Sequence, residues 1–306
     1  MTNLETNIQS QLEWAPIVLF AYNRPDHLER TLGSLKKNIG ASESRLFIYC
    51  DGPKPGEESS TQAVRDLAHR TEGFKEVTVF ESSENRGLAN SIISGVTEQV
   101  NRFGKVVVLE DDMVTSPHFL SFLNDGLKEY EHDDKVISIH GYAYPTKKSL
   151  PENFFLRGSD CWGWATWKRG WDLFEADGQK LLDEILEKDL TYEFNLLGSY
   201  DYLTMLKNQI VGKNNSWAIR WHASAFLRDR LTLYSGQSLV ENIGLDGSGT
   251  HCGVADNFNS DHLPQQKIPV TGIEPVENRE ALKAFADYFH STRPSLFTRI
   301  RRRLLG

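Results

Sequence analysis

The sequence predicts an α/β domain in which a mostly parallel sheet is flanked by helices. Through the first half of the chain, short apolar runs alternate with amphipathic segments, and this strand–helix order favours a parallel sheet. The runs are continuously apolar, which is the form expected of strands covered on both faces. With 306 residues, of which 39% are hydrophobic and 25% charged, the chain has the composition of an ordinary globular enzyme.

Strands and helices alternate in the first part of the chain. Strands are predicted at residues 16–21, 46–50, 77–80 and 106–109. Helices are predicted from Arg24-Pro25-Asp26 onward and at 63–69 and 88–100. The first helix has an apolar face made by Leu28, Leu32 and Leu35. Asp26 with Glu29 three residues later resembles a capping box at its start.

The second half is less regular and is rich in tryptophan. Further strands are predicted at 136–139 and 216–225, helices at 181–188 and 200–211, and a glycine-rich loop at 245–251. Trp162 and Trp164 flank a glycine and are expected to line a pocket. Trp167 and Trp171 stand at helical spacing and are expected in the core.

We expect one catalytic domain at 1–276, with a nucleotide half at about 15–112 and an acceptor half at about 113–276, followed by a helical, basic tail at 277–306. A net charge of −8 argues against nucleic acid as a partner, because phosphate binding needs a basic face. The three cysteines (Cys50, Cys161 and Cys252) are odd in number and lack metal spacing. A reducing cytosol is therefore expected. No apolar run reaches the roughly 20 residues needed to span a bilayer, and the start lacks a signal peptide's apolar centre.

Polar groups follow each of the four predicted parallel strands. They are Tyr22-Asn23-Arg24, Asp51-Gly52, Glu81-Ser82-Ser83 with Asn85-Arg86-Gly87, and Glu110-Asp111-Asp112. Because ligands of such sheets bind outside the carboxyl ends of the strands, one cleft is expected to hold them all.

The acidic triplet Glu110-Asp111-Asp112 is the most informative of these strand ends. Three carboxylates at the end of a buried strand need a cation or polar ligands, since unpaired charge there is costly. Mg²⁺ or Mn²⁺ binds through one or two carboxylates plus substrate phosphates, so a nucleoside diphosphate is expected. The alternative is a strand end whose acids are simply solvated.

In order and spacing these motifs resemble the GT-A glycosyltransferases, in particular the inverting enzymes related to N-acetylglucosaminyltransferase I and the bacterial family-2 transferases. The resemblance covers residues 16–251. The motifs that carry it are Ala21-Tyr22-Asn23-Arg24-Pro25, Asp51-Gly52-Pro53-Lys54, Asn85-Arg86-Gly87, Glu110-Asp111-Asp112-Met113, Ser116-Pro117-His118-Phe119 and Cys161-Trp162-Gly163-Trp164.

The resemblance implies a role for each strand-end residue. Asp112 would ligate Mn²⁺ or Mg²⁺, Asp111 would contact the ribose, and Glu110 would contact a donor-sugar hydroxyl. Asp51 would accept from the uracil NH, and Tyr22 and Arg24 would frame the base and phosphates. Arg86 would lie beside the pyrophosphate, or alternatively form a surface ion pair. Trp162 and Trp164 would pack against the sugar.

An inverting transferase needs a general base that deprotonates the acceptor hydroxyl. The family places it near the start of a helix after the tryptophan-rich segment, and Asp201 fits best, although a helix cap explains it equally well. Asp172 and Asp246 are the second and third choices. His251 would complete the metal site or contact the pyrophosphate. The weaker affinity of imidazole for Mg²⁺ than for Mn²⁺ argues against a role as a Mg²⁺ ligand.

The expected activity is metal-dependent transfer of a sugar from a UDP-sugar, with N-acetylglucosamine first and glucose or galactose as alternatives, to a glycan or lipid-linked glycan in bacterial surface polysaccharide synthesis. A glycoside hydrolase would also use paired carboxylates and tryptophan platforms, and a non-catalytic carbohydrate-binding protein is the alternative if Asp112 or Asp201 is misplaced. A nucleotidyltransferase should show a glycine-rich loop after the first strand, where Tyr22-Asn23-Arg24-Pro25 stands instead. The segment 294–306 combines arginines with bulky apolar residues. It is expected either to lie on the inner face of a membrane or to form a basic tail or packed helix.

Overall fold

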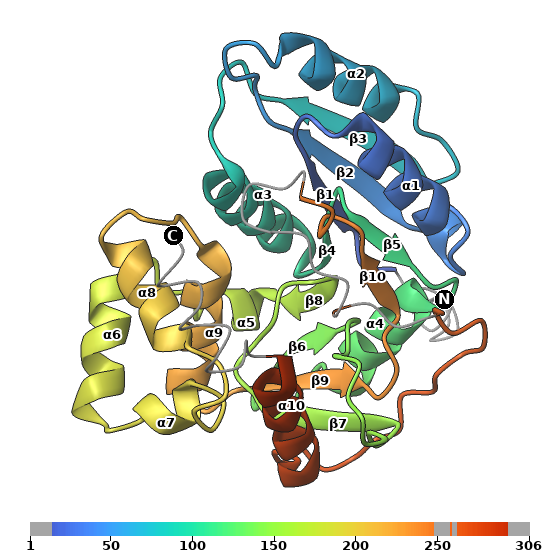
Figure 1. Ribbon diagram of the computed structural model, residues 1–306. Helices are drawn as coiled ribbons and strands as arrows, with labels where there is room; N and C mark the ends of the chain where they lie inside the picture. The colour runs from blue at the N-terminus through green and yellow to red at the C-terminus, as the bar shows by residue number, and fades with distance from the viewer. Residues whose placement is uncertain (1–13, 248–257, 259–261, 293–306) are drawn as a thin grey trace, which may run out of the picture.

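The computed structural model describes residues 14–247, 258 and 262–292 (Figure 1). The strands in this part of the chain are β1 (Ile17–Ala21), β2 (Arg45–Cys50), β3 (Glu76–Glu81), β4 (Lys105–Glu110), β5 (Met113–Thr115), β6 (Val136–His140), β7 (Asn153–Arg157), β8 (Trp164–Trp167), β9 (Leu231–Ser235) and β10 (Val240–Asn242). The α-helices are α1 (Pro25–Leu35), α2 (Glu58–His69), α3 (Leu88–Phe103), α4 (Phe119–Glu129), α5 (Lys168–Trp171), α6 (Gly178–Glu187), α7 (Thr191–Phe194), α8 (Tyr202–Ile210), α9 (Trp217–Leu227) and α10 (Arg279–Thr292).

The described strands form an eight-stranded sheet in the order β3-β2-β1-β4-β8-β6-β9-β7 and a two-stranded sheet of β10 and β5. The first four strands run parallel to one another. Strands β8 and β7 run against their neighbours, whereas β6 and β9 pair in parallel. The predicted α/β fold with a mostly parallel sheet is confirmed.

Helices cover both faces of the sheet. One core includes Leu28 and Leu32 of α1 and Phe119 of α4, packed on Leu19 of β1. The other includes Ile92 of α3 and residues of α9. The predicted first-half elements are all present, with ends shifted by a few residues. The predicted capping box is wrong: Arg24 is the N-cap, and no side chain caps α1.

A cluster of four tryptophans corrects two predictions. Trp164 is 0% exposed, and its ring packs against Trp171, Trp217 and Trp221. Trp164 is therefore a core residue and lines no pocket. The segment 216–225, predicted as a strand, belongs to helix α9, in which Ser216 caps the start by accepting from the Ile219 N–H. Trp167 is also buried, as predicted, but it lies in strand β8.

The second half adds a helical lobe beside the sheet. Helices α6, α8 and α9 share an apolar core that includes Ile185, Leu206 and Phe226. Helix α10 packs on β7 through Phe285, whose ring meets the Phe154 ring edge-on at 5.7 Å. No helix among the described residues is long and apolar enough to cross a membrane. The segment 294–306 lies outside the described residues, and the division at residue 277 stays a prediction.

Candidate active site

The register of the parallel strands brings the predicted polar groups to one edge of the sheet. Phe20 of β1 lies opposite Tyr49 of β2 and Glu110 of β4, and Cys50 lies opposite Glu81 of β3. The residues that follow these strands therefore share the carboxyl edge, as their sequence positions predict.

Arg24, at the start of α1, reaches across this edge to the acidic triplet. Its Nη2 atom donates to Asp112 Oδ2 at 2.8 Å and also forms an ion pair with Asp111. Asp111 further accepts from the Tyr22 N–H at 3.4 Å. The Thr31 hydroxyl, about two turns farther along α1, donates to the Asp111 carbonyl at 2.8 Å. The start of helix α1 is thus bound to the residues after β4 through the side chains of Asp111 and Asp112 and through the backbone carbonyl of Asp111.

One guanidinium does not compensate for three carboxylates. Burial, together with repulsion from Asp112 and Asp111, raises the pKa of Glu110 to about 8. Burial also raises the pKa of Asp111 to about 6, although Arg24 opposes that shift. This edge of the sheet therefore favours an additional cation.

Asp112 fits a divalent metal. It is 8% exposed, and its Oδ1 atom is buried without a hydrogen-bond partner, while Oδ2 is bound to Arg24. The described residues hold no group of three or more Asp, Glu, His or Cys side chains suited to a metal ion. A single carboxylate oxygen completed by phosphate oxygens and water matches the way Mg²⁺ and Mn²⁺ bind in nucleotide sites. His251 lies outside the described residues.

The backbone after β10 covers the Arg24–Asp112 pair, a contact that the sequence interpretation missed. A Cβ atom on Gly244 would lie 2.1 Å from Asp112 Oδ2 and 2.9 Å from Arg24 Nη1. The Ile243 N–H donates to the Asp112 carbonyl at 2.9 Å. Only glycine fits this approach, so the glycine that follows Asn242-Ile243 was the available signal.

Asp51 joins two loops of the carboxyl edge. Its Oδ1 atom accepts from the N–H groups of Gly52 and Arg86, each at 2.8 Å, and Oδ2 accepts from the Gly87 N–H at 2.9 Å. Oδ2 keeps a lone pair for another donor, such as a base NH. The Arg86 side chain is exposed and makes no ion pair with another described residue.

Tyr22 is held by Glu57, a residue that the sequence interpretation missed. The Tyr22 hydroxyl donates to Glu57 and accepts from the Lys54 N–H at 3.0 Å. Asn23 also donates to Glu57, at 3.0 Å, and the Lys54 ammonium lies 5.5 Å from the centre of the Tyr22 ring. Burial and the bond to Glu57 raise the pKa of Tyr22 to about 12. Glu57 comes from the loop after β2, and only its proximity in the fold reveals it.

The segment before β8 brings acceptor-half residues to the same edge. Trp164 lies opposite Val108 of β4, so residues 160–163 stand beside the end of that strand. Trp162 is half-buried, and its ring meets Tyr142 at 4.8 Å. The backbone N–H of Trp162 donates to His140 Nε2 at 3.1 Å.

Asp160 also lies in this segment, and the sequence interpretation missed it. It accepts from the Cys161 N–H at 2.8 Å and from the Tyr144 hydroxyl at 3.3 Å. The signal was a carboxylate directly before the Cys161–Trp164 motif.

Asp201 is the N-cap of α8 and accepts from the Thr204 N–H at 3.1 Å. Tyr202 of the same helix contacts Tyr144, so this helix start adjoins Asp160. Leu196 and Leu197, just before it, have φ values of 50° and 53°. Such left-handed backbone in non-glycine residues costs on the order of 1–3 kcal/mol each and is commonest at functional sites.

The two other base candidates lie in different surroundings. Asp172 pairs with Lys168 at 2.6 Å, and the Lys168 N–H donates to the Gly104 carbonyl, at the opposite edge of the sheet. That position excludes Asp172 as the base. Asp246 Oδ2 lies 3.2 Å from His27 Nε2 near the start of α1.

Comparisons with known proteins show the family of the chain. Residues 17–179, just over half of the chain, match the family described as Glycosyl transferase family 2. An alpha-1,3-mannosyl-glycoprotein 2-beta-N-acetylglucosaminyltransferase from Arabidopsis thaliana is 25% identical over 174 residues, which are 53% of this chain and 39% of that protein. The chain therefore spans about two-fifths of this relative.

One solved structure with partial likeness is a mannosyltransferase from Pyrobaculum calidifontis in complex with GDP-Man and Mn²⁺. It is 16% identical with a TM-score of 0.30, and the match covers 44% of this chain and 39% of that chain. TarS of S. aureus has 12% identity, a TM-score of 0.29, and coverage of 45% and 23%. Likenesses at these TM-scores carry no argument about the site.

Proposed function

The chain belongs to glycosyl transferase family 2, and from this premise we propose that it transfers a sugar from a UDP-sugar, first UDP-N-acetylglucosamine, to a hydroxyl of a glycan. The observation that carries the donor assignment is the buried, unpartnered Oδ1 of Asp112 beside the Arg24 guanidinium. N-acetylglucosamine is favoured because the Arabidopsis relative is named as a transferase of that sugar. A bacterial surface polysaccharide or its lipid-linked precursor remains the proposed acceptor.

Asp112 would hold the metal, with the diphosphate supplying the remaining ligands. Mn²⁺ or Mg²⁺ at this position would neutralise charge on the departing diphosphate. Arg24, now bound to two aspartates, is close enough to add a second positive group at the phosphates. Arg86, exposed at the start of α3, would approach from the β3 side.

The nucleoside would lie across the ends of β1 and β2. Asp51 has acceptor capacity left on Oδ2 for the uracil NH, and its position is fixed by three backbone donors. The Tyr22 ring, locked by Glu57, would form the wall beside the base. Asp111 would accept from the ribose, and Glu110 would contact the sugar.

The acceptor would enter from the side of Trp162 and α8. A general base must remove the acceptor proton as the hydroxyl attacks the anomeric carbon. Asp201 remains our proposed base, because the strained backbone before it fixes the start of α8 beside Asp160 and Tyr144. Asp160 would orient the acceptor, and it is the alternative base.

The experiment is a thermal-shift and calorimetric titration of UDP with and without Mn²⁺, followed by a screen of UDP-sugars for metal-dependent hydrolysis or transfer. We expect stabilisation by UDP that needs Mn²⁺ in the wild type and is lost in Asp112→Asn, with the fold intact by circular dichroism. A hydrolase or a non-catalytic carbohydrate-binding protein would show no metal-dependent stabilisation by UDP, and that result would overturn the proposal.

A further inference from the structure

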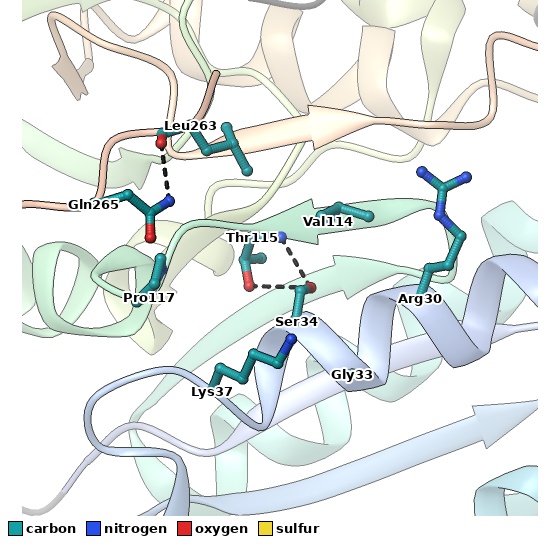
Figure 2. A pocket seen from close by; sticks show the side chains of 9 residues that line it. All are labelled: Arg30, Gly33, Ser34, Lys37, Val114, Thr115, Pro117, Leu263 and Gln265. Atoms are coloured by element: carbon teal, nitrogen blue, oxygen red, sulfur yellow. Dashed lines mark hydrogen bonds between the residues drawn. The ribbon is translucent and has the colours of Figure 1, made fainter. Parts of the chain in front are cut away.

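A groove separate from the donor site lies between α1, β5 and residues 263–265. Its volume is about 490 Å³, and it is lined by Arg30, Gly33, Ser34, Lys37, Val114, Thr115, Pro117, Leu263 and Gln265. Figure 2 shows Arg30 of α1 and Lys37, which follows the end of α1, on either side of Gly33 and Ser34, with β5 and the 263–265 segment opposite. Among the residues that the structure describes, no carboxylate lines the groove.

The two cations of the groove form no ion pair with another residue that the structure describes, in a protein of net charge −8. Neither Arg30 nor Lys37 has a carboxylate partner among the described residues, whereas the adjacent Lys36 is paired with Glu72 at 3.2 Å. Arg30 lies within α1, whereas Lys37 lies two residues after its end at Leu35. A ligand that satisfies both must carry separated negative charges or a single anion between them.

The hydroxyl groups of the groove hold its walls together. The Ser34 hydroxyl donates to the Thr31 carbonyl at 2.9 Å and accepts from the Thr115 N–H at 3.0 Å. Thr115 Oγ1 accepts from Asn38 at 2.9 Å. The Gln265 Nε2 atom also donates within the lining, to the Leu263 carbonyl at 3.1 Å. Since these groups are used internally, the two cations and the Gln265 amide oxygen are what the groove offers to a ligand.

The remaining lining is apolar and open. Val114, Pro117 and Leu263 provide apolar surface, and a Cβ atom on Gly33 would meet nothing within 4 Å. Apolar surface beside fixed charges suits a pyranose, which has an apolar C–H face and, in acidic sugars, a carboxylate or phosphate.

The groove and the donor site are built on the same two segments, α1 and the chain from Asp112 to β5. Val114 and Thr115 follow Asp112 by two and three residues. Arg30 lies six residues after Arg24 on α1, about 9 Å along the helix. A glycan bound there would have one end near the donor diphosphate.

We propose that this groove binds an acidic glycan, with Arg30 and Lys37 taking its carboxylate or phosphate groups. The choice of a glycan as the ligand rests on the proposed function. The anion contact itself rests on the two unpaired cations and the absence of acids in the lining.

The test is calorimetric titration of the full chain with tetragalacturonate, and with maltotetraose and tetraglutamate as comparison ligands, at low and high salt. Arg30→Gln/Lys37→Gln removes the groove charges, and Gly33→Leu fills the groove without contacting the core. Lys36→Gln is the matched control, since it removes one charge from the same helix outside the groove. We expect tetragalacturonate to bind at least tenfold tighter than either comparison ligand, with weaker binding at high salt. The double variant and Gly33→Leu should each lose at least tenfold in affinity, and Lys36→Gln should retain it.

Absence of tetragalacturonate binding, equal binding in the double variant, or equal binding of tetraglutamate would each overturn the inference. A competition experiment, in which mannose 6-phosphate displaces bound tetragalacturonate, distinguishes recognition of phosphate from recognition of carboxylate. A preference for the phosphate and a preference for the carboxylate both support an acidic glycan as the ligand. UDP with Mn²⁺ is titrated into the same variants. A failure of UDP to bind the wild type would overturn the proposed function while the groove result stands by itself.

Discussion

Arg24 lies between the two aspartates of the acidic triplet, with its Nη2 atom 2.8 Å from Asp112 Oδ2. The guanidinium is the cation nearest the position that a metal bound to Asp112 would take. A metal ion arriving alone must compete with this positive charge, whereas a metal ion bound to a diphosphate brings negative charge that Arg24 can bind. The geometry therefore favours metal binding together with the nucleotide.

Removing the guanidinium should tighten binding of the metal alone. In Arg24→Gln we expect Mn²⁺ to bind without nucleotide at least tenfold tighter than in the wild type, and UDP to bind more weakly in the presence of Mn²⁺. Electron paramagnetic resonance of free Mn²⁺ measures the first effect, and calorimetry the second. Arg45→Gln, which removes a surface partner of Glu76, is the charge-matched control. Equal Mn²⁺ affinity in Arg24→Gln and wild type would contradict this competition.

The close approach of Gly244 makes it a sharp probe of the same site. In Gly244→Ala, a Cβ atom 2.1 Å from Asp112 Oδ2 forces the carboxylate or the backbone after β10 to move. We expect a loss of about 1–3 kcal/mol in the free energy of unfolding, typical of overpacking, and weaker UDP binding with Mn²⁺. Gly33→Ala, where the added Cβ meets nothing within 4 Å, is the control. Urea unfolding measures the change in stability, and UDP titration measures the change in affinity. If the free energy of unfolding and the UDP affinity were both unchanged in Gly244→Ala, the close approach of Gly244 to Asp112 would not be needed.

The two acceptor-side carboxylates can be separated by their kinetics. Asp201→Asn keeps a good helix cap, because asparagine caps as well as aspartate, so its effect reports the charge alone. We expect it to lower turnover at least a hundredfold with donor affinity retained, since a base contributes general catalysis of that order. Asp160→Asn, which keeps an acceptor for the Cys161 N–H, should mainly raise the Michaelis constant for the acceptor. The reverse pattern would assign the base to Asp160.

The strand ends were predictable, because parallel strands are continuous apolar runs whose carboxyl ends meet at one edge. Helix α9 was not, because nine of its eleven residues are buried, including Trp217, Arg220 and Trp221. A helix buried all round has no polar face, so its sequence lacks the helical period and was interpreted as a strand.

The site was predictable only where its residues follow strands directly. Arg24 and Asp112 were identified this way. Glu57, Asp160 and Gly244 were not, since each lies in a loop and reaches the site through contacts distant in sequence. Trp164 was misassigned because its neighbours Trp217 and Trp221 lie more than fifty residues later in the chain.

Acidification should destabilise the protein through His140. This imidazole is 0% exposed, Nδ1 donates to the Tyr142 carbonyl at 2.9 Å, and Nε2 accepts from the Trp162 N–H at 3.1 Å. The bond accepted by Nε2 requires the neutral ring, and burial lowers the pKa of His140 below its ordinary value of 6.5. Well above pH 6.5 the ring is neutral in both the folded and the unfolded protein, so it contributes no pH dependence to the free energy of unfolding. As the pH falls below 6.5, the unfolded chain takes up a proton that the folded protein refuses, so the free energy of unfolding decreases.

Replacing the ring should remove part of this dependence. His140→Gln keeps an acceptor for the Trp162 N–H but cannot titrate, and we expect a smaller loss of stability between pH 7.5 and pH 5.5 than in the wild type, in urea unfolding monitored by circular dichroism. His222, also buried with a lowered pKa, contributes a slope of the same sign, whereas the raised pKa values of Glu110 and Asp111 contribute a slope of the opposite sign. His69→Gln is the control, because His69 is exposed on α2 beside Glu81. If His140→Gln and wild type lost the same stability over this range, the neutral His140 would not be what makes the fold acid-sensitive, and the bond to Trp162 would tolerate protonation of the ring.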